Sequence, residues 1–290
     1  MRTLIPLLLT MPSLALAGTA IDERADMAAD GTVTVINISG EIDISTWDEA
    51  AVHLTGELGE GSELSFDASG GDVRVEVKVE DGGRWGRGPE SSDLVLRVPR
   101  KADLVVTGVS ADVRIDGAGG RMIEAESVSG DVQATGDVER LELTSVSGDV
   151  DFRGSARRTV AESVSGDIDL DGVEGELEVS LVSGDLELLA GTLELGRFEA
   201  VSGTLDMAVT VAPGGRLSVE TMSGDVILLL PAEQQGVFQA QTFSGDIRSV
   251  FGSPQRSRSG SGTRLDHETG ENGASIRLET FSGDVRIGHK

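Results

Sequence analysis

The residues best placed to do chemistry in this sequence are the aspartates of a recurrent Ser-Gly-Asp triplet. Asp131, Asp149, Asp167 and Asp185 follow one another at 18-residue intervals. If the chain stacks with that period, neighbouring carboxylates lie about 4.8 Å apart and repel by roughly 0.9 kcal/mol even in bulk water. Backbone amides, raised pKa values or a hard cation could offset this repulsion. Calcium bound along these four aspartates is therefore one hypothesis.

The triplet also has a local structural explanation, which we favour. Gly supplies a backbone conformation closed to other residues, and Ser and Asp oxygens can accept hydrogen bonds from turn amides. The complete copies are Ser129, Gly130, Asp131; Ser147, Gly148, Asp149; Ser165, Gly166, Asp167; Ser183, Gly184, Asp185; Ser223, Gly224, Asp225; Ser244, Gly245, Asp246; and Ser282, Gly283, Asp284. Ser202, Gly203 and Thr204 form a variant copy. We expect structural turns here, and we expect no cofactor.

Other catalytic or metal-binding patterns have little support in the sequence. His53, His267 and His289 are far apart and lack motif partners, and the chain has no Cys. Zinc sites and Ser-His-Asp catalysis are therefore not expected. Because paired carboxylates can cleave glycosidic bonds, a polysaccharide-acting enzyme is a remote alternative. Its acids should break the repeat, whereas these recur at one turn position, so we predict that the protein is not an enzyme.

The repeat predicts the elements that position the triplets. Aligned copies place apolar residues in columns that alternate with polar residues at period two, as in strands with one buried face. The columns include Ile123, Leu141, Thr159 and Leu177; Val132, Val150, Ile168 and Leu186; and, between them, an unbroken column of Val128, Val146, Val164 and Val182. A coil of this length is too short for a strand-helix repeat. We therefore predict an all-β protein, a single-stranded parallel β-solenoid with about 18–21 residues per coil.

Later steps between triplets are longer, and the ends are less regular. The step from Ser244 to Ser282 is 38 residues, which predicts two coils, one of them without the triplet. We expect residues 18–105 to form an irregular β-strand region that caps the solenoid, and residues 106–290 to form the regular part. Residues 253–273 are rich in Ser and Gly and contain Arg256, Arg258 and Arg264. We predict a projecting loop, either simply solvated or docking an anionic partner.

The N-terminus and the overall charge indicate where the protein works. Met1-Arg2, an apolar run from Leu4 to Leu16 and the triplet Ala15-Leu16-Ala17 are typical of a secretory signal peptide over residues 1–17. No other segment is apolar enough to predict a transmembrane span. The net charge of −26 disfavours nucleic acid and anionic membrane surfaces as partners. We expect an exported protein, in the periplasm or at the cell surface.

The sequence resembles a bacterial β-strand-repeat family of unknown function whose members are proposed adhesins, related to the head domains of autotransporter adhesins. The resemblance rests on Ser39 to Ile44 followed by Trp47-Asp48, on Leu94 to Pro99, and on the Ser-Gly-Asp turns. It implies a β-solenoid on the cell envelope without catalytic residues. We therefore expect an adhesin-like or interaction module with a protein or glycan partner. The alternative is a periplasmic scaffold or envelope-stress component that binds a protein, and the oligomeric state is left open.

Overall fold

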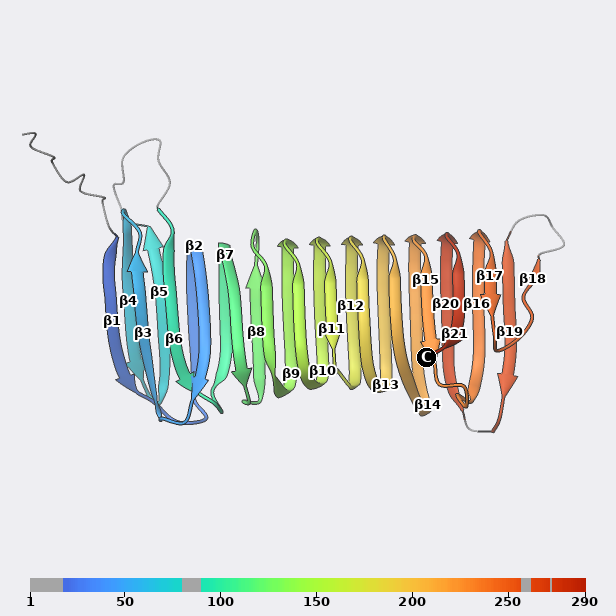
Figure 1. The fold of residues 1–290 in the computed structure, drawn as a ribbon, viewed down its shortest axis with the longest axis horizontal. Coiled ribbons are helices and arrows are strands. Elements are labelled where there is room, and N and C mark those ends of the chain that lie inside the picture. The colour runs from blue at the N-terminus through green and yellow to red at the C-terminus, as the bar shows by residue number, and fades with distance from the viewer. Residues whose placement is uncertain (1–17, 80–89, 257–261, 272) are drawn as a thin grey trace, which may run out of the picture.

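The computed structural model describes residues 18–79, 90–256, 262–271 and 273–290, and these residues form 21 β-strands and no helix. The predicted all-β class is confirmed. The predicted signal peptide, residues 1–17, lies outside the described residues. Figure 1 shows the strands stacked side by side along one long axis, with the N-terminal strands at one end and the C-terminal strands near the other.

The first ten strands in chain order are β1 (Thr19–Asp26), β2 (Thr32–Trp47), β3 (Ala51–Leu58), β4 (Ser62–Ser69), β5 (Asp72–Val79), β6 (Ser92–Pro99), β7 (Asp103–Ala118), β8 (Met122–Ser127), β9 (Val132–Ser147) and β10 (Val150–Ser165). Eleven follow: β11 (Ile168–Asp171), β12 (Gly175–Ser183), β13 (Leu186–Ser202), β14 (Leu205–Ser223), β15 (Val226–Leu230), β16 (Gly236–Ser244), β17 (Ile247–Ser249), β18 (Gln255–Arg256), β19 (Thr263–Thr269), β20 (Ala274–Ser282) and β21 (Val285–His289).

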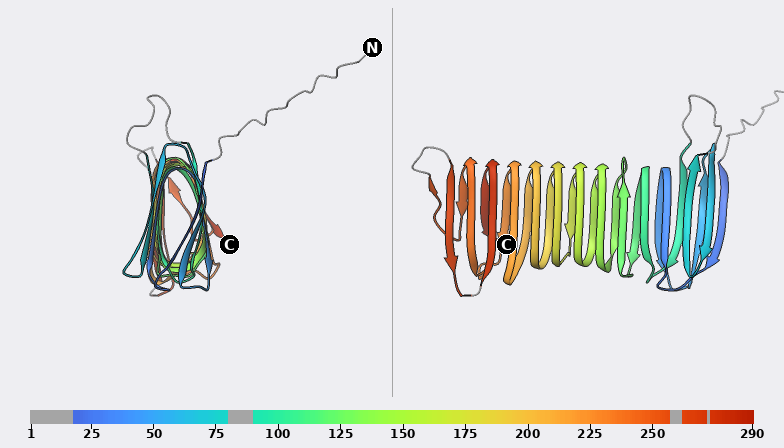
Figure 2. Two further views of the ribbon diagram at one scale, coloured as in Figure 1. Left: turned by 90° about the vertical axis from the view of Figure 1, so that its left-hand side faces the viewer. Right: turned by 180° about the vertical axis from the view of Figure 1, so that it is seen from behind.

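The middle of the molecule is a β-solenoid-like stack of parallel coils. Val132 pairs with Val150, Val150 with Ile168, and Ile168 with Leu186, each 18 residues further on. The same column then continues to Leu205 and beyond. Long strands such as β9 and β10 bend at a corner and so contribute to both broad faces. Seen end-on, the coils therefore enclose a flattened tube (Figure 2).

The core of the tube is mainly aliphatic and continuous from end to end. Alternate residues point inward, as the burial of β13 shows, and the inward residues of neighbouring coils stack in columns. Three phenylalanines, Phe152, Phe198 and Phe238, are the largest side chains that are fully buried. Because no coil can bury its apolar face alone, each one depends on its neighbours for stability.

Antiparallel strands cover the N-terminal end of the stack. β3 pairs antiparallel with both β1 and β6, and β4 pairs antiparallel with β5. β2 lies between these strands and β7, with which it pairs in parallel from Thr32 to Ser45. The uniform parallel pairing expected for the solenoid therefore stops at this end. The outermost strands of this antiparallel end are β1, which pairs with β3, and β4, which pairs with β5.

The C-terminal end departs from the predicted order of coils. β20 lies between β14 and β16, because Ile276 pairs with Leu217 on one side and with Phe238 on the other. β21 lies in the same way between β15 and β17 (Figure 1). We predicted two further coils for the 38-residue step from Ser244 to Ser282, and this prediction is wrong. β16 and β17 form the outer coil first. The chain then turns back, and β20 and β21 fill the space between that coil and strands β14 and β15.

The segment 253–273 is also different from the predicted loop. Thr263–Thr269 forms β19, which pairs antiparallel with β16 and covers the C-terminal end of one face. β18 pairs antiparallel with β19. Residues 257–261, with Arg258, and residue 272 lie outside the described residues. Exposed strand edges at the end of a stack must be covered, and the return path of the chain supplies this cover.

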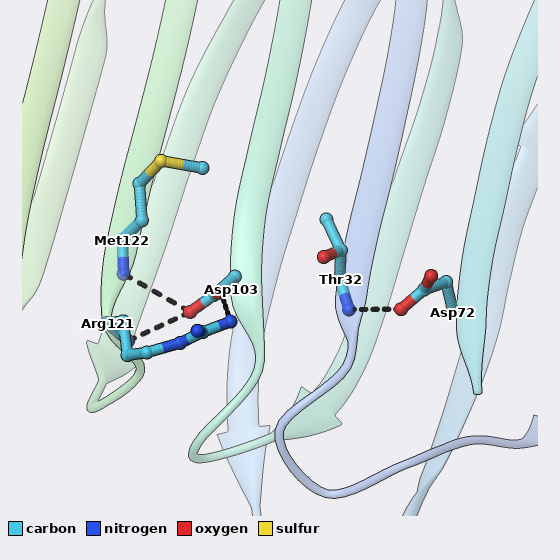
Figure 3. A network of polar contacts seen from close by, with 5 residues as sticks. All are labelled: Thr32, Asp72, Asp103, Arg121 and Met122. Atoms are coloured by element: carbon cyan, nitrogen blue, oxygen red, sulfur yellow. Dashed lines mark hydrogen bonds and ion pairs between the residues drawn. The ribbon is translucent and has the colours of Figure 1, made fainter. Parts of the chain in front are cut away.

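Aspartates hold the corner between coils near the N-terminal end, as Figure 3 shows. Oδ1 of Asp72 accepts a hydrogen bond from the backbone amide of Thr32 at 2.8 Å. Oδ1 of the buried Asp103 accepts the amides of Arg121 at 2.9 Å and Met122 at 3.3 Å, and its Oδ2 pairs with the guanidinium of Arg121. These contacts satisfy amides at strand starts that would otherwise lack a partner.

Candidate functional site: an apolar ridge along one edge

A row of exposed apolar side chains runs along the corner where each coil enters its Ser-Gly turn. We call it the apolar ridge. In spatial order it consists of Val109, Val128, Val146, Val164, Val182, Val201, Met222, Phe281 and Phe243, and these side chains are between 41% and 59% exposed. Their order follows the pairing of the adjacent serines, in which Ser223 pairs with Ser282 and Ser282 with Ser244. One apolar residue therefore stands on each successive coil.

The ridge is exposed because of the alternation within each strand. Ser127, Ser145 and Ser163 occupy the inward positions just before the corner and are at most 3% exposed. The next residue in each coil must therefore point outward, and this residue is the valine of the column singled out in the sequence. The alternation of inward and outward residues, counted from these buried serines, could have located the ridge in the sequence. The repeat identified the valines from Val128 to Val182 as a column but did not assign them to the surface.

A shallow groove of about 850 Å³ follows the ridge from Thr144 to the aromatic end. Its other wall is an outward column two residues earlier in each strand. In spatial order this column comprises Thr144, Glu162, Ser180, Glu199, Glu220, Glu279 and Gln241. We call it the acidic column. Contiguous exposed apolar surface of this kind is typical of interaction sites.

The two ends of the ridge differ in character. Valines occupy six consecutive coils, whereas Met222, Phe281 and Phe243 occupy the last three. The rings of Phe243 and Phe281 are stacked, with centroids 5.0 Å apart and an interplanar angle of 6°. Three glutamates of the acidic column, Glu199, Glu220 and Glu279, lie on adjacent coils beside this end. The largest apolar area and the densest carboxylates therefore coincide.

The Ser-Gly-Asp aspartates lie on the other side of the ridge, and each one joins two coils. Oδ1 of Asp131 accepts the backbone amide of Asp149 at 3.0 Å, Oδ1 of Asp149 accepts that of Asp167 at 2.9 Å, and Oδ1 of Asp167 accepts that of Asp185 at 2.8 Å. Asp185 continues the series to Thr204 at 2.7 Å. Each carboxylate thus meets a partial positive charge, which offsets the repulsion along the file. We had expected the aspartate to accept a hydrogen bond within its own turn. Instead, each carboxylate accepts one from the turn of the next coil.

The glycine of the turn is required mainly by close packing between coils. A Cβ on Gly148 would lie 2.2 Å from the carbonyl oxygen of Gly130, and one on Gly166 would lie 2.2 Å from that of Gly148. Neither glycine has a φ in the left-handed region, although Gly203 has one, at 135°. The backbone conformation that we expected to explain this glycine therefore applies only to some coils. Any side chain would push two coils apart.

A second file of carboxylates lies beside the turn aspartates. Asp151, Asp169, Glu187 and Asp206 pair in register on four successive coils. Burial is the main cause that raises the pKa of Asp169, and the neighbouring charges of Asp151 and Glu187 raise it further. Within the described ranges, no three or more His, Asp or Glu side chains are grouped as metal ligands. The calcium hypothesis for Asp131, Asp149, Asp167 and Asp185 stays a prediction.

The histidines are distributed over both ends of the molecule. His53 Nε2 lies 2.9 Å from Oδ1 of Asp22 at the N-terminal cap. His267 and His289 contact the aromatic rings of Phe238 and Phe251 respectively at the other end. The first contact is polar and the other two are packing interactions, and none of the three places a nucleophile beside a base. In the described ranges, no helix is long and apolar enough to cross a membrane.

The fold and the ridge together define a repeat protein with an open groove along the stack. The chain belongs to the Toastrack DUF4097 family, whose model matches residues 32–288. The family resemblance inferred from the sequence is confirmed. A comparison with curated proteins finds no match.

The solved structures that match this chain have little sequence identity to it. One, from Parabacteroides distasonis ATCC 8503 and provisionally described as a lipid-binding protein, is 13% identical with a TM-score of 0.48. Another, from Bacteroides fragilis NCTC 9343 and provisionally described as an adhesin, is 13% identical with a TM-score of 0.45. Each alignment covers 93% of this chain and 97% of the other.

Proposed function

We propose that this protein is an exported, non-enzymatic, adhesin-like interaction module of the cell envelope, and that a protein partner docks along the apolar ridge. The observation that carries the proposal is the ridge itself. Nine half-exposed apolar side chains stand in one row on nine successive coils. Scattered surface apolar residues need no explanation, but a contiguous row does. The repeat gives the partner a long surface to bind, as in other stacked-repeat proteins.

Export follows from the signal peptide expected over residues 1–17, and a β-solenoid of about 18–21 residues per coil can be stable in an oxidising compartment without disulfides. The chain has no Cys, so its stability comes from stacking and from hydrogen bonds between coils. Mass spectrometry of the protein from the producing bacterium tests export. We expect an N-terminus at Gly18, and an intact Met1 on protein found in the cytoplasm contradicts the proposal.

Docking through the ridge is tested by fractionating bacteria that produce ridge variants. Met222→Ser combined with Phe281→Ser and Phe243→Ser removes the largest apolar side chains of the ridge. Leu189→Ser combined with Leu195→Ser and Val237→Ser is the matched control, because these residues are between 40% and 54% exposed and lie off the ridge. We expect the wild type and the control to stay with the envelope and the ridge variant to be released. Equal retention of all three contradicts the proposal.

Protease treatment of intact cells then distinguishes the adhesin from the periplasmic scaffold. A surface adhesin is cleaved without permeabilising the cells, whereas a periplasmic scaffold is protected until the outer barrier is opened. We expect cleavage in intact cells. Protection there, together with ridge-dependent retention on the envelope, assigns the interaction to the periplasm instead.

A further inference from the structure

We propose that the occupant of the ridge is a cationic, amphipathic α-helix of a partner protein, and that it lies over Val201, Met222, Phe281 and Phe243. This inference rests on the proposed function and adds the chemistry of the partner. Three properties of this end of the ridge support it: the spacing of the apolar side chains along the stack, the size of these side chains, and the charges on both sides of the ridge.

The spacing of the ridge matches a helix better than an extended peptide. Successive coils present one apolar side chain about every 4.8 Å along the stack. A helix presents side chains on one face about every 5.4 Å, whereas an extended strand presents them only about every 6.6 Å. The side chains of a helix parallel to the stack therefore fall out of register with the ridge by about 2 Å over four coils. The flexible side chain of Met222 can absorb that difference. The backbone at this corner also pairs along the stack, so it offers no strand edge to a peptide.

The side chains at this end can anchor a helix. The ridge changes from valines to Met222 and then to the stacked rings of Phe281 and Phe243, which are 56% and 52% exposed. Aromatic residues and Met are enriched in the buried centre of protein interfaces, where a few side chains supply most of the affinity. The valine section presents a smaller and more uniform surface. We therefore place the anchor at the aromatic end.

Charge selects a cationic partner. Glu199, Glu220 and Glu279 lie on one side of this section, and the aspartates of the turns, such as Asp225 and Asp284, are exposed on the other side. Arg197 and Arg277 pair with Glu199 at 4.0 Å and Glu279 at 2.7 Å, but they stand on the side of the acidic column away from the ridge. A helix with Lys or Arg on both borders of its apolar face complements this arrangement.

The same charges disfavour the other occupants of an apolar surface. Two copies of a chain with a net charge of −26 repel each other, and apposed ridges would bring acidic columns together. An anionic lipid surface is repelled for the same reason. The acidic field instead accelerates the approach of a basic segment, with a rate that falls as salt is added.

Binding of a designed peptide to the protein without its signal peptide tests the inference. The probe is a labelled helix of about 18 residues, or five turns, with Leu on one face and Lys on both borders. A peptide of the same composition in scrambled order is the control. We expect fluorescence anisotropy to show binding of the helix at least about tenfold tighter than of the scrambled peptide, a difference of about 1.4 kcal/mol. Equal binding of both peptides means charge attraction alone and overturns the inference.

Variants locate the peptide on the surface. We expect Met222→Ser with Phe281→Ser to weaken binding about tenfold or more, and Glu199→Gln with Glu220→Gln to weaken it and reduce its salt dependence. Leu189→Ser, an exposed apolar residue off the ridge, should leave binding unchanged. A loss in Leu189→Ser equal to that of the ridge variant overturns the inference, as does ridge-dependent dimerisation or tighter binding to anionic vesicles of phosphatidylglycerol.

A footprint on the wild-type protein avoids any effect of substitution on folding. Met222 is 59% exposed, so hydrogen peroxide should oxidise it readily, and the bound peptide should protect it. Met122, which is partly buried on β8, is the internal reference. Protection of Met222 no greater than that of Met122 contradicts the inference. If envelope retention depends on the ridge but the peptide does not bind, the proposed function stands and only the helical occupant is wrong.

Discussion

Oδ1 of Asp149 accepts a hydrogen bond from the backbone amide of Asp167 at 2.9 Å, across the boundary between two coils. Asp246 and Asp284 continue the pattern at the C-terminal end, where Asp246 donates its amide to Oδ1 of Asp284 at 2.9 Å. A residue that repeats with the period of the fold therefore also fastens each coil to the next. The same contact explains why a file of like charges is stable beside the apolar ridge.

Substitution of Asp167 tests this role. Asp167→Ala removes the acceptor of the Asp185 amide, and we expect a loss of about 1 kcal/mol in the free energy of unfolding. Asp167→Asn keeps an oxygen acceptor and removes one charge from the file, so its stability should stay near that of the wild type. Urea denaturation measures both. Equal destabilisation by Ala and Asn would show that the charge of Asp167 matters more than the hydrogen bond.

Gly148 tests the packing between turns. Because a Cβ there would lie 2.2 Å from the carbonyl oxygen of Gly130, we expect Gly148→Ala to destabilise the protein by about 1–3 kcal/mol. Gly191→Ala is the control, since its nearest neighbour, the Cβ of Glu174, lies at 3.5 Å. Thermal unfolding followed by circular dichroism gives the comparison. Similar melting temperatures for the two variants contradict the packing explanation.

Asp169 predicts a pH dependence of stability. Its pKa is raised by burial and by Asp151 and Glu187, so the folded state binds this proton more tightly than the unfolded state. Stability therefore falls as pH rises from the ordinary aspartate value of about 3.9 through the raised pKa. Asp169→Asn should stabilise the protein at neutral pH and flatten that slope. Asp30→Asn, at an exposed site at the other end, is the control, and an unchanged slope in Asp169→Asn refutes the prediction.

The inserted C-terminal strands predict the effect of truncation. Removing residues 274–290 leaves β14 and β16 without the strand that joins them. We expect trypsin then to cleave rapidly at Arg248 and Arg256 and to leave a resistant fragment that includes β1 to β14. Removal of residues 231–290 should yield the same fragment. Resistance of the first truncation at both arginines would show that β16 holds its place without β20.

The sequence predicted the repeat well because side-chain columns record the register directly. Leu186 and Val132 could be placed in one column by counting. The order of the coils could not be predicted in this way, because Ser282 carries the same turn as Ser244 and fits beside either neighbour. Locating the apolar ridge required one further step. Ser145 had to be recognised as the inward residue at the corner, so that Val146 points outward. The hydrogen bond between aspartates could not be foreseen, since a turn amide within the same coil was an equally good donor.

The most direct measurement is site-specific photo-crosslinking in the producing bacterium. A photoreactive amino acid at Met222, on the ridge, is compared with the same amino acid at Leu189, which is 54% exposed and lies off the ridge. We expect a discrete covalent adduct with one partner protein from position 222 and none from position 189. Adducts from position 189 alone, or none from position 222 under conditions where the protein is held on the envelope, would contradict this expectation.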